Sequence, residues 1–300
     1  LFRSTSGGTS ITSGAALDLN GVNYSNAEAL TINGTGISSG GAVMNSSSTG
    51  ATYAGLITLG STGASIVGGA GTITLSNAGT ITGATYGLTL GGAAGGAIAS
   101  IIGSTTGTLT KVDAGTWTLN GVNTYSGSTT VSAGTLVIGG SGSLGSGAYA
   151  GNIANSGTFQ YSSSANQTLS GIISGGGALT KDTSSSSILT LSNANTYTGA
   201  TTVSAGTLKL GNASALGTTA GITTVSSGGA LDLNGTTYTT AEALTINGAG
   251  ISSAGAVINS SSTAASYAGL IALGSNSSIV GGTGTIAIAN AGTITGAYTL

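Results

Sequence analysis

Short runs that alternate a small or hydroxylated residue with an aliphatic one recur along the whole chain. Each run follows the order glycine, small, apolar, small, apolar. An alternation with a period of two is typical of a β-strand that buries one face. Five runs share this template: Gly71–Leu75, Gly115–Leu119, Gly134–Ile138, Gly206–Leu210 and Gly284–Ile288. No segment sustains a period of 3.6, so the pattern predicts an all-β chain with almost no helix.

The residues that end these runs predict tight turns. Glycine, asparagine and serine follow nearly every run, and they adopt a positive φ or hydrogen-bond the nearby backbone more easily than other residues. Asn-Gly pairs stand at Asn20-Gly21, Asn33-Gly34 and Asn120-Gly121. Because such pairs recur at equivalent positions of repeats, we interpret them as the corners of a repeating coil.

The chain contains two internal repeats of different length. Residues 16–88 match residues 230–300: for example, Ala16–Gly21 returns as Ala230–Gly235, 214 positions later. A smaller repeat at residues 109–136 matches residues 179–208. The second copy of the large repeat runs out at Leu300, so we expect a longer parent chain.

Strand runs recur every 8 to 14 residues or so, a spacing that also suits an antiparallel sandwich. Self-similarity is instead typical of solenoids, and a chain of mostly small residues lacks the bulk for a two-layer aromatic core. We therefore predict one continuous β-solenoid over residues 1–300, with about 20 residues per coil and about 15 coils. Its core is expected to contain aliphatic residues stacked in rows: Leu17, Leu19, Leu30, Ile32, Ile73, Leu75, Leu109, Leu119, Val131, Leu136, Leu179, Leu191, Val203, Leu208, Leu231 and Leu233.

The composition supports an ordered structure in which nearly every strand has two neighbours. Glycine is 57 of 300 residues, proline is absent and charged residues are 3%, while the mean hydropathy is +0.39. Disordered chains combine low hydropathy with high charge. Proline cannot donate to a β-ladder, and identical charges stacked about 4.8 Å apart would repel.

Several function classes are excluded by residues that the chain lacks. It has no cysteine and no histidine, which excludes disulfides, zinc sites and histidine acid–base chemistry. We expect no metal and no cofactor. The basic residues are Arg3, Lys111, Lys181 and Lys209 and the net charge is −2, too little for nucleic-acid binding. No apolar run is long enough for a membrane-spanning helix.

The smaller repeat resembles the passenger-associated transport repeat of autotransporter proteins. The resemblance lies in the order Leu-Thr-Lys, Gly-Thr-x-Thr-Leu, Asn-Thr-Tyr-x-Gly and Thr-Thr-Val-Ser-Ala-Gly-Thr-Leu. The residues that carry it are Lys111 and Lys181, Trp117 and Leu189, Leu119 and Leu191, Asn123 and Asn195, Tyr125 and Tyr197, Gly127 and Gly199, Val131 to Leu136 and Val203 to Leu208. The resemblance implies a right-handed parallel β-helix on a bacterial surface.

Candidate chemistry is sparse, and each candidate has a simpler interpretation. Asp18 with Glu28, or Asp232 with Glu242, would form a carboxylate pair of the kind that hydrolyses polysaccharides; the simpler interpretation is lone surface acids. Threonine pairs such as Thr116/Thr118 would suit an ice-binding face, but threonine is also a common outward strand residue. The glycine-rich stretch at residues 68–71 lacks the aspartate of a calcium-binding nonapeptide. Repeated tyrosines are interpreted as packing at coil edges, with sugar or partner stacking as the alternative: Tyr24, Tyr53, Tyr125, Tyr197, Tyr238 and Tyr267.

The sequence therefore predicts a non-enzymatic, extracellular solenoid with no catalytic residues. Its partners are expected to be cell-surface, matrix or polysaccharide ligands, bound by many weak contacts. The alternative is a subunit of a filament, in which copies of the chain join end to end through exposed coil edges.

Overall fold

The alternating runs form short parallel strands in the computed structural model, which describes residues 8–300. Arg3 lies outside these residues. The chain divides into two compact units, Leu1–Ser146 and Gly147–Leu300. Together they hold about 13 coils, close to the number predicted, and the all-β parallel solenoid is confirmed. The described residues contain no α-helix, only three short 3-10 turns: η1 (Ile37–Ser39), η2 (Gly145–Gly147) and η3 (Ile251–Ser253). The prediction of one continuous solenoid over the whole chain stays a prediction.

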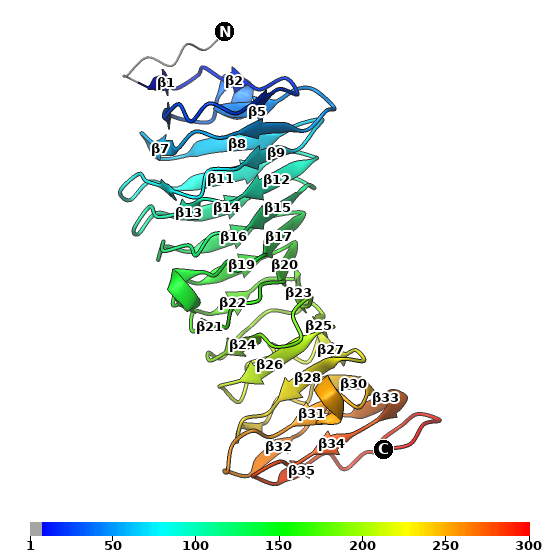
Figure 1. Cartoon of the computed structure of the whole chain (residues 1–300). Coiled ribbons are helices and arrows are strands. Elements are labelled where there is room, and N and C mark those ends of the chain that lie inside the picture. Colours follow the sequence, from blue (N-terminus) through cyan, green and yellow to red (C-terminus); the bar gives the residue numbers. More distant parts are fainter. Residues whose placement is uncertain (1–7) are drawn as a thin grey trace. The chain divides into compact units, whose positions relative to one another are not determined.

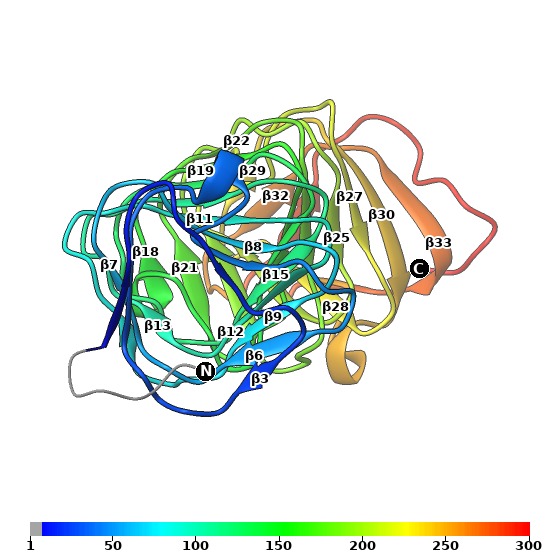
Figure 2. The same ribbon diagram turned by 90° about the horizontal axis from the view of Figure 1, so that it is seen from above.

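The strands of the first unit lie on distinct faces. One face contains β2 (Leu17–Asp18), β5 (Val43–Asn45), β8 (Ala64–Gly68), β11 (Leu88–Gly91), β14 (Leu109–Lys111) and β16 (Thr129–Val131). A second contains β3 (Asn23–Tyr24), β6 (Ala51–Tyr53), β9 (Ile73–Leu75), β12 (Gly95–Ile98), β15 (Thr116–Leu119) and β17 (Thr135–Ile138). The third is made by β1 (Thr9–Ile11), β4 (Leu30–Ile32) and β7 (Ile57–Leu59), and by the pair β10 (Thr80–Ile81) and β13 (Ile101–Ile102). Figure 2 shows β7, β8 and β9 on three different sides of this unit.

The second unit repeats this arrangement. One face contains β18 (Ala148–Tyr149), β21 (Gln167–Leu169), β24 (Ile188–Leu191), β26 (Gly206–Leu210), β28 (Gly229–Asp232), β31 (Val257–Ile258) and β34 (Ile279–Val280). A second contains β20 (Thr158–Tyr161), β23 (Ala178–Lys181), β25 (Thr201–Val203), β27 (Ile222–Val225), β30 (Ala243–Gly248) and β33 (Ile271–Ser277). Shorter ladders are formed by β19 (Ile153–Asn155) with β22 (Ile173–Ser174), and by β29 (Thr237–Tyr238), β32 (Ala265–Tyr267) and β35 (Ile286–Ile288).

Strands pair with the strand one coil later, in parallel and in register. Leu109 lies beside Thr129, which is 20 residues later, and Leu189 lies beside Leu208, which is 19 residues later. Figure 1 shows β8, β11, β14 and β16 one below another in the first unit. A register that keeps like residues together stacks the aliphatic side chains in rows and leaves the alternate positions facing outward.

The inward rows form the core that the alternation predicts. On β15, Trp117 and Leu119 are fully buried while Thr118 between them is only half-buried. Of the sixteen aliphatic residues expected inside, fifteen are buried. The prediction was wrong for Leu17, which is half-exposed. The reason is local: within residues 8–300, β2 pairs along one edge only, with β5, and Leu17 lines a cavity on its other side.

One of the three Asn-Gly pairs has a positive φ at both residues, Asn33-Gly34 has it at Gly34 alone (69°), and Asn120-Gly121 has it at neither residue. Asn20 and Gly21 have φ values of 43° and 73°, and Asn234 and Gly235 repeat them at 48° and 71°. Two successive positive φ values reverse the chain sharply, and asparagine followed by glycine tolerates them best. The corners of the two large repeats are therefore equivalent in structure as well as in sequence.

Candidate functional site

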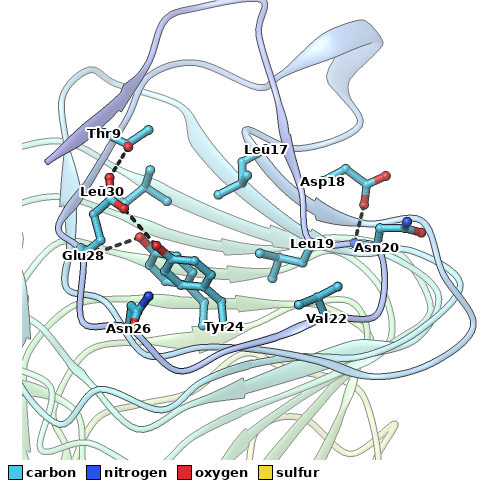
Figure 3. A pocket seen from close by; sticks show the side chains of 11 residues that line it. Thr9, Leu17, Asp18, Leu19, Asn20, Val22, Tyr24, Asn26, Glu28 and Leu30 are labelled. Atoms are coloured by element: carbon cyan, nitrogen blue, oxygen red, sulfur yellow. Dashed lines mark hydrogen bonds between the residues drawn. The ribbon is translucent and has the colours of Figure 1, made fainter. Parts of the chain in front are cut away.

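A cavity with a volume of about 390 Å³ lies in the first unit, beside β2 and β4 (Figure 3). Its floor is apolar, with Leu17, Leu19 and Leu30 among the lining residues. Two acidic side chains, Asp18 and Glu28, also line it. A concave apolar surface with a few polar groups is the usual form of a binding site, so the polar groups decide what this cavity can do.

Glu28 is held by two hydroxyl groups and is 8% exposed. Thr9 Oγ1 donates to one carboxylate oxygen and Tyr24 Oη donates to the other at 2.9 Å, as the dashed lines in Figure 3 show. Tyr53 Oη donates to the backbone carbonyl of the same residue at 2.7 Å. Hydrogen bonds of this number satisfy a buried carboxylate and fix its position.

The two tyrosines of this group stack across neighbouring coils. Tyr24 on β3 lies beside Tyr53 on β6, with ring centroids 5.4 Å apart and an interplanar angle of 10°. Burial, together with the charges of Glu28 and Tyr24, raises the pKa of Tyr53 to about 12. Tyr53 therefore keeps its proton and donates a hydrogen bond at any physiological pH.

Asp18 belongs to a separate network on the solvent side of β2. It accepts hydrogen bonds from the backbone N–H and the hydroxyl of Ser46, one coil away, and from the N–H of Asn20 at 2.9 Å. Desolvation opposes the charged form, but these hydrogen bonds prevail and lower the pKa of Asp18. The predicted pairing of Asp18 with Glu28 is thus not a hydrogen-bonded dyad, because each carboxylate accepts from its own set of donors.

The same four-residue group recurs in the second unit as Thr223, Tyr238, Glu242 and Tyr267, 214 positions later. Thr223 and Tyr238 donate to the Glu242 carboxylate at 2.8 and 3.0 Å, and Tyr267 donates to its backbone carbonyl at 2.9 Å. The tyrosine rings stack 5.1 Å apart at 8°. We call these two groups the first and second Glu–Tyr clusters.

The second cluster is sealed inside its unit. Glu242, Tyr238 and Tyr267 are each 0% exposed. Burial raises the pKa of Glu242 to about 7, although the hydrogen bonds from Thr223 and Tyr238 favour its charged form. The interpretation of these glutamates as surface acids is therefore wrong. Of the two aspartates, Asp18 is exposed, as a surface acid would be, whereas its equivalent Asp232 is buried.

The repeated tyrosines lie inside the coils rather than at their edges, so that interpretation is also wrong for most of them. Five of the six are at most 3% exposed, and Tyr24 is half-buried. Tyr125 and Tyr197 each share a 2.8 Å hydrogen bond with the hydroxyl of the threonine four residues later, Thr129 and Thr201. A hydroxyl partner lets the ring occupy the interior without a buried unsatisfied oxygen.

The lysines of the smaller repeat are buried cations bound to backbone carbonyls. Lys111 Nζ donates to the carbonyls of Val112, Asp113 and Ala133 at 2.5–3.1 Å. Lys181 Nζ does the same for Asp182, Ser184 and Ala205 at 3.2–3.4 Å. Both lysines are 0% exposed. Burial lowers the pKa of both, that of Lys181 to about 8, while the adjacent aspartate raises it.

Replacing Lys111 with methionine is expected to lower the free energy of unfolding by about 2 kcal/mol, because three buried carbonyl oxygens lose their donor. The variant no longer buries the charged ammonium group of Lys111, and this gain offsets part of the loss in stability. Urea unfolding followed by circular dichroism measures the change. Lys209→Met is the matched control, since Lys209 is partly exposed and its single ion pair, with Asp232 at 3.7 Å, is worth about 0–1 kcal/mol. A Lys111→Met variant as stable as the parent would contradict the role of the carbonyl cage.

The asparagines of the smaller repeat are buried caps of the coil corner. Asn123 Oδ1 accepts from the N–H of Ile102, and its Nδ2 donates to the carbonyls of Gly121 and Ser143. Asn195 repeats the first contact with Ile173 and donates to Ala215. Each asparagine joins successive coils, so the sequence order of the repeat is explained by inward contacts: a lysine that binds carbonyls, an asparagine that caps a corner and a tyrosine that binds a threonine.

The comparison with protein-family models agrees with this structure. The model of the passenger-associated transport repeat matches residues 109–138 and 184–210. The chain carries two passenger-associated transport repeats. Their parallel β-solenoid setting matches the autotransporter passenger repeat that the sequence resembles. Comparisons with curated proteins and with solved structures found no match.

The matched segments contain Lys111, Asn123 and Asn195, whereas Lys181 lies three residues before the second segment. The Glu–Tyr clusters lie outside both matched segments. Residues 8–300 contain no group of three or more acidic side chains that could hold a metal ion. No helix within the same residues is long and apolar enough to cross a membrane.

Proposed function

We propose that the chain is a non-enzymatic segment of an extracellular stalk or adhesin on a bacterial cell. The observation that carries the proposal is the presence of two passenger-associated transport repeats in a parallel β-solenoid. An autotransporter passenger is the part of such a protein that is exported, and export implies a place at the cell surface.

The outward rows support contact by many weak interactions. In the second unit, Thr180, Thr202, Thr224 and Thr245 lie side by side on four successive coils. All four are half-buried and face outward. Rows of neutral hydroxyls repeat one binding element along the surface, and repeated weak contacts add to a high avidity. Cell-surface, matrix and polysaccharide ligands are the partners that such a surface suits.

The acidic residues support the absence of catalysis. Glu28 and Glu242 are held by tyrosine and threonine hydroxyls, and Asp18 and Asp232 by backbone and serine donors. A glycosidase requires one carboxyl as acid and another as base or nucleophile on either side of the substrate. None of these carboxylates shares a hydrogen-bond network with a second one, in contrast to such a pair.

The test of the adhesin role measures retention of beads on surfaces coated with matrix proteins or polysaccharides. Beads carrying many copies of the chain are expected to be retained, with retention rising steeply with copy density. Replacing Thr202, Thr224 and Thr245 by alanine is expected to reduce retention. Replacing Thr89, Thr110 and Thr130, an equivalent row of the first unit, is expected to reduce retention to a similar degree, because the proposed contacts are repeated along the surface. Release of soluble sugar from any coating, or no retention at any density, would contradict the proposal.

A second candidate function is end-to-end assembly into filaments. The observation that favours it is the in-register parallel pairing of successive coils, as between β14 and β16 and between β24 and β26. A strand of another copy of the chain would continue this pairing at the edge of a terminal coil. Electron micrographs of the isolated chain decide between the two: open-ended fibres favour the filament, and single particles of fixed length favour the stalk.

A further inference from the structure

A polar groove with a volume of about 280 Å³ lies in the second unit, beside β21, β24 and β26. Figure 1 shows these three strands one after another. Their register places Thr168, Thr190 and Lys209 side by side in one outward row. Asn166 and Ile188 also line the groove. The row therefore changes from hydroxyl to ammonium within three coils, and one apolar side chain lies beside it.

The neutral polar groups of this groove have hydrogen-bonding capacity that the chain does not use. Asn166 Oδ1 accepts from the N–H of Ile188 at 2.9 Å, which fixes the orientation of the amide. Within residues 8–300, the Nδ2 group of Asn166 and the hydroxyls of Thr168 and Thr190 have no hydrogen-bond partner. Asn166 is exposed and both threonines are half-buried. These groups can therefore bind a ligand without losing a contact within the chain.

Lys209 adds the one accessible positive charge among the described lysines. Its side chain is 28% exposed, whereas the other two lysines are fully buried. Lys209 Nζ donates to Ser260 Oγ at 3.2 Å, and its 3.7 Å distance to Asp232 Oδ2 is longer than a direct hydrogen bond. Asp232 does not depend on this lysine, because Asn234 and Ser260 donate to it at 2.6–3.0 Å. An ammonium group has three donors, so Lys209 can also bind an anion in the groove.

The apolar part of the groove suits the face of a sugar ring. Ile188 is half-buried and lies two positions before Thr190 on β24. A sugar ring has carbon-bound hydrogens on its face and hydroxyls around its rim. An aliphatic side chain with hydroxyl and amide groups close by is complementary to both. Because drug-sized pockets have volumes of about 300–1,000 Å³, this smaller groove suits a single sugar unit of a longer chain.

We propose that this groove binds one acidic sugar unit of a polysaccharide. The carboxylate or sulfate of the sugar binds Lys209. Its hydroxyls hydrogen-bond Thr168, Thr190 and the amide of Asn166, and the face of its ring packs against the side chain of the isoleucine. The charge lets this site discriminate between acidic and neutral sugars, which rows of neutral hydroxyls alone do not. The inference rests on the proposed adhesin function and deepens it, because it names a ligand class and a site.

The test is isothermal titration calorimetry of the full 300-residue chain with three sugar trimers: galacturonate, sulfated galactose and unmodified galactose. We expect saturable one-to-one binding of at least one acidic trimer. The neutral trimer is expected to bind about tenfold more weakly, because it lacks the charge-assisted contact. The tighter of the two acidic trimers tells carboxylate from sulfate. Binding of none of them, or equal binding of all three, would overturn the proposal.

Variants of the chain test the named contacts. Lys209→Met is expected to weaken binding of the acidic trimer about tenfold, and Lys209→Arg, which keeps the charge, to retain it. Thr190→Ala is expected to weaken binding several-fold. Thr118→Ala is the matched control, because Thr118 is an outward threonine on β15 of the first unit. Circular dichroism checks that each variant keeps the parent fold. An unchanged affinity in Lys209→Met, or an equal loss in Thr118→Ala and Thr190→Ala, would overturn the proposal.

The result is distinguishable from the outcome of the bead assay. A chain that binds an acidic trimer but gives no bead retention on any coating supports the groove and contradicts the adhesin function. A chain that is retained on the coatings but binds no acidic trimer contradicts the groove alone, because the retention then comes from another surface.

Discussion

Leu119→Asp is expected to lower the free energy of unfolding by about 4 kcal/mol, because it places an unpaired carboxylate in the core. Leu119 is 0% exposed and stacks between Ile98 and Ile138 of the adjacent coils. Urea unfolding followed by circular dichroism measures the loss.

Thr118→Asp is the matched control for this substitution. Thr118 is the adjacent residue on the same strand, faces outward and is half-buried. A single outward charge with neutral neighbours is expected to cost less than about 1 kcal/mol. Equal losses in the two variants would mean that the inward and outward faces of β15 are assigned incorrectly.

The second large effect is expected from Glu242→Gln, which should remove a fall in stability between pH 4.5 and pH 7. Burial raises the pKa of Glu242 from 4.5 to about 7 in the folded state. A raised folded pKa means that the native state holds the proton more tightly than the unfolded state. The stabilisation is complete below pH 4.5 and is lost as the pH rises through 7.

This fall should amount to about 2 kcal/mol for the parent chain, after allowance for partial relaxation around the charged carboxylate. Glu242 faces Tyr238, Tyr267 and Tyr197, whose pKa values are all raised by burial, so these phenols stay neutral throughout this range. Glutamine can accept a hydrogen bond with its oxygen, and it carries no charge. Glu242→Gln is therefore expected to be more stable than the parent at pH 8 and similar to it at pH 4.

Asp18→Asn is the control, because the pKa of Asp18 is shifted in the opposite direction from that of Glu242 and its effect on stability has the opposite pH dependence. The hydrogen bonds that lower the pKa of Asp18 stabilise the fold above its unfolded pKa of 3.8, and this contribution is lost on acidification. The variant is expected to be less stable than the parent at neutral pH and to keep the fall between pH 4.5 and 7. Unfolding curves at several pH values measure both effects. A Glu242→Gln variant with the same slope as the parent between pH 4.5 and 7 would rule out the sealed carboxylate as its cause.

Alternation and repetition are sufficient to predict the solenoid and most of its core. The template at Gly115–Leu119 and Gly206–Leu210 becomes β15 and β26, with the aliphatic positions buried as expected. The reason is physical: an in-register parallel stack imposes the same inside and outside on every coil. Leu17 departs from this rule because, within residues 8–300, β2 pairs along one edge alone, with β5.

The buried charges could not be predicted in the same way. Lys111 and Glu242 are polar residues at inward positions, and their placement depends on carbonyl and hydroxyl donors or acceptors contributed by other coils. These partners are not evident from the sequence, because residues that form a hydrogen bond, such as Thr223 and Glu242, are 19 residues apart. One signal was present in the sequence, because a tyrosine stands four residues before the glutamate in both copies, as Tyr24 with Glu28 and Tyr238 with Glu242.

The most direct test of the parallel stack is disulfide formation between paired cysteines in a chain that has none of its own. Thr180 and Thr202 are register partners on adjacent strands, and Thr224 lies one coil further. Adjacent strands are about 4.8 Å apart, and a disulfide joins Cα atoms about 4.4–6.8 Å apart. Thr180→Cys with Thr202→Cys is expected to cross-link on mild oxidation, as read by mass spectrometry. Thr180→Cys with Thr224→Cys is expected not to cross-link. Failure of the first pair, or equal linking of both, would contradict the stacked parallel coils.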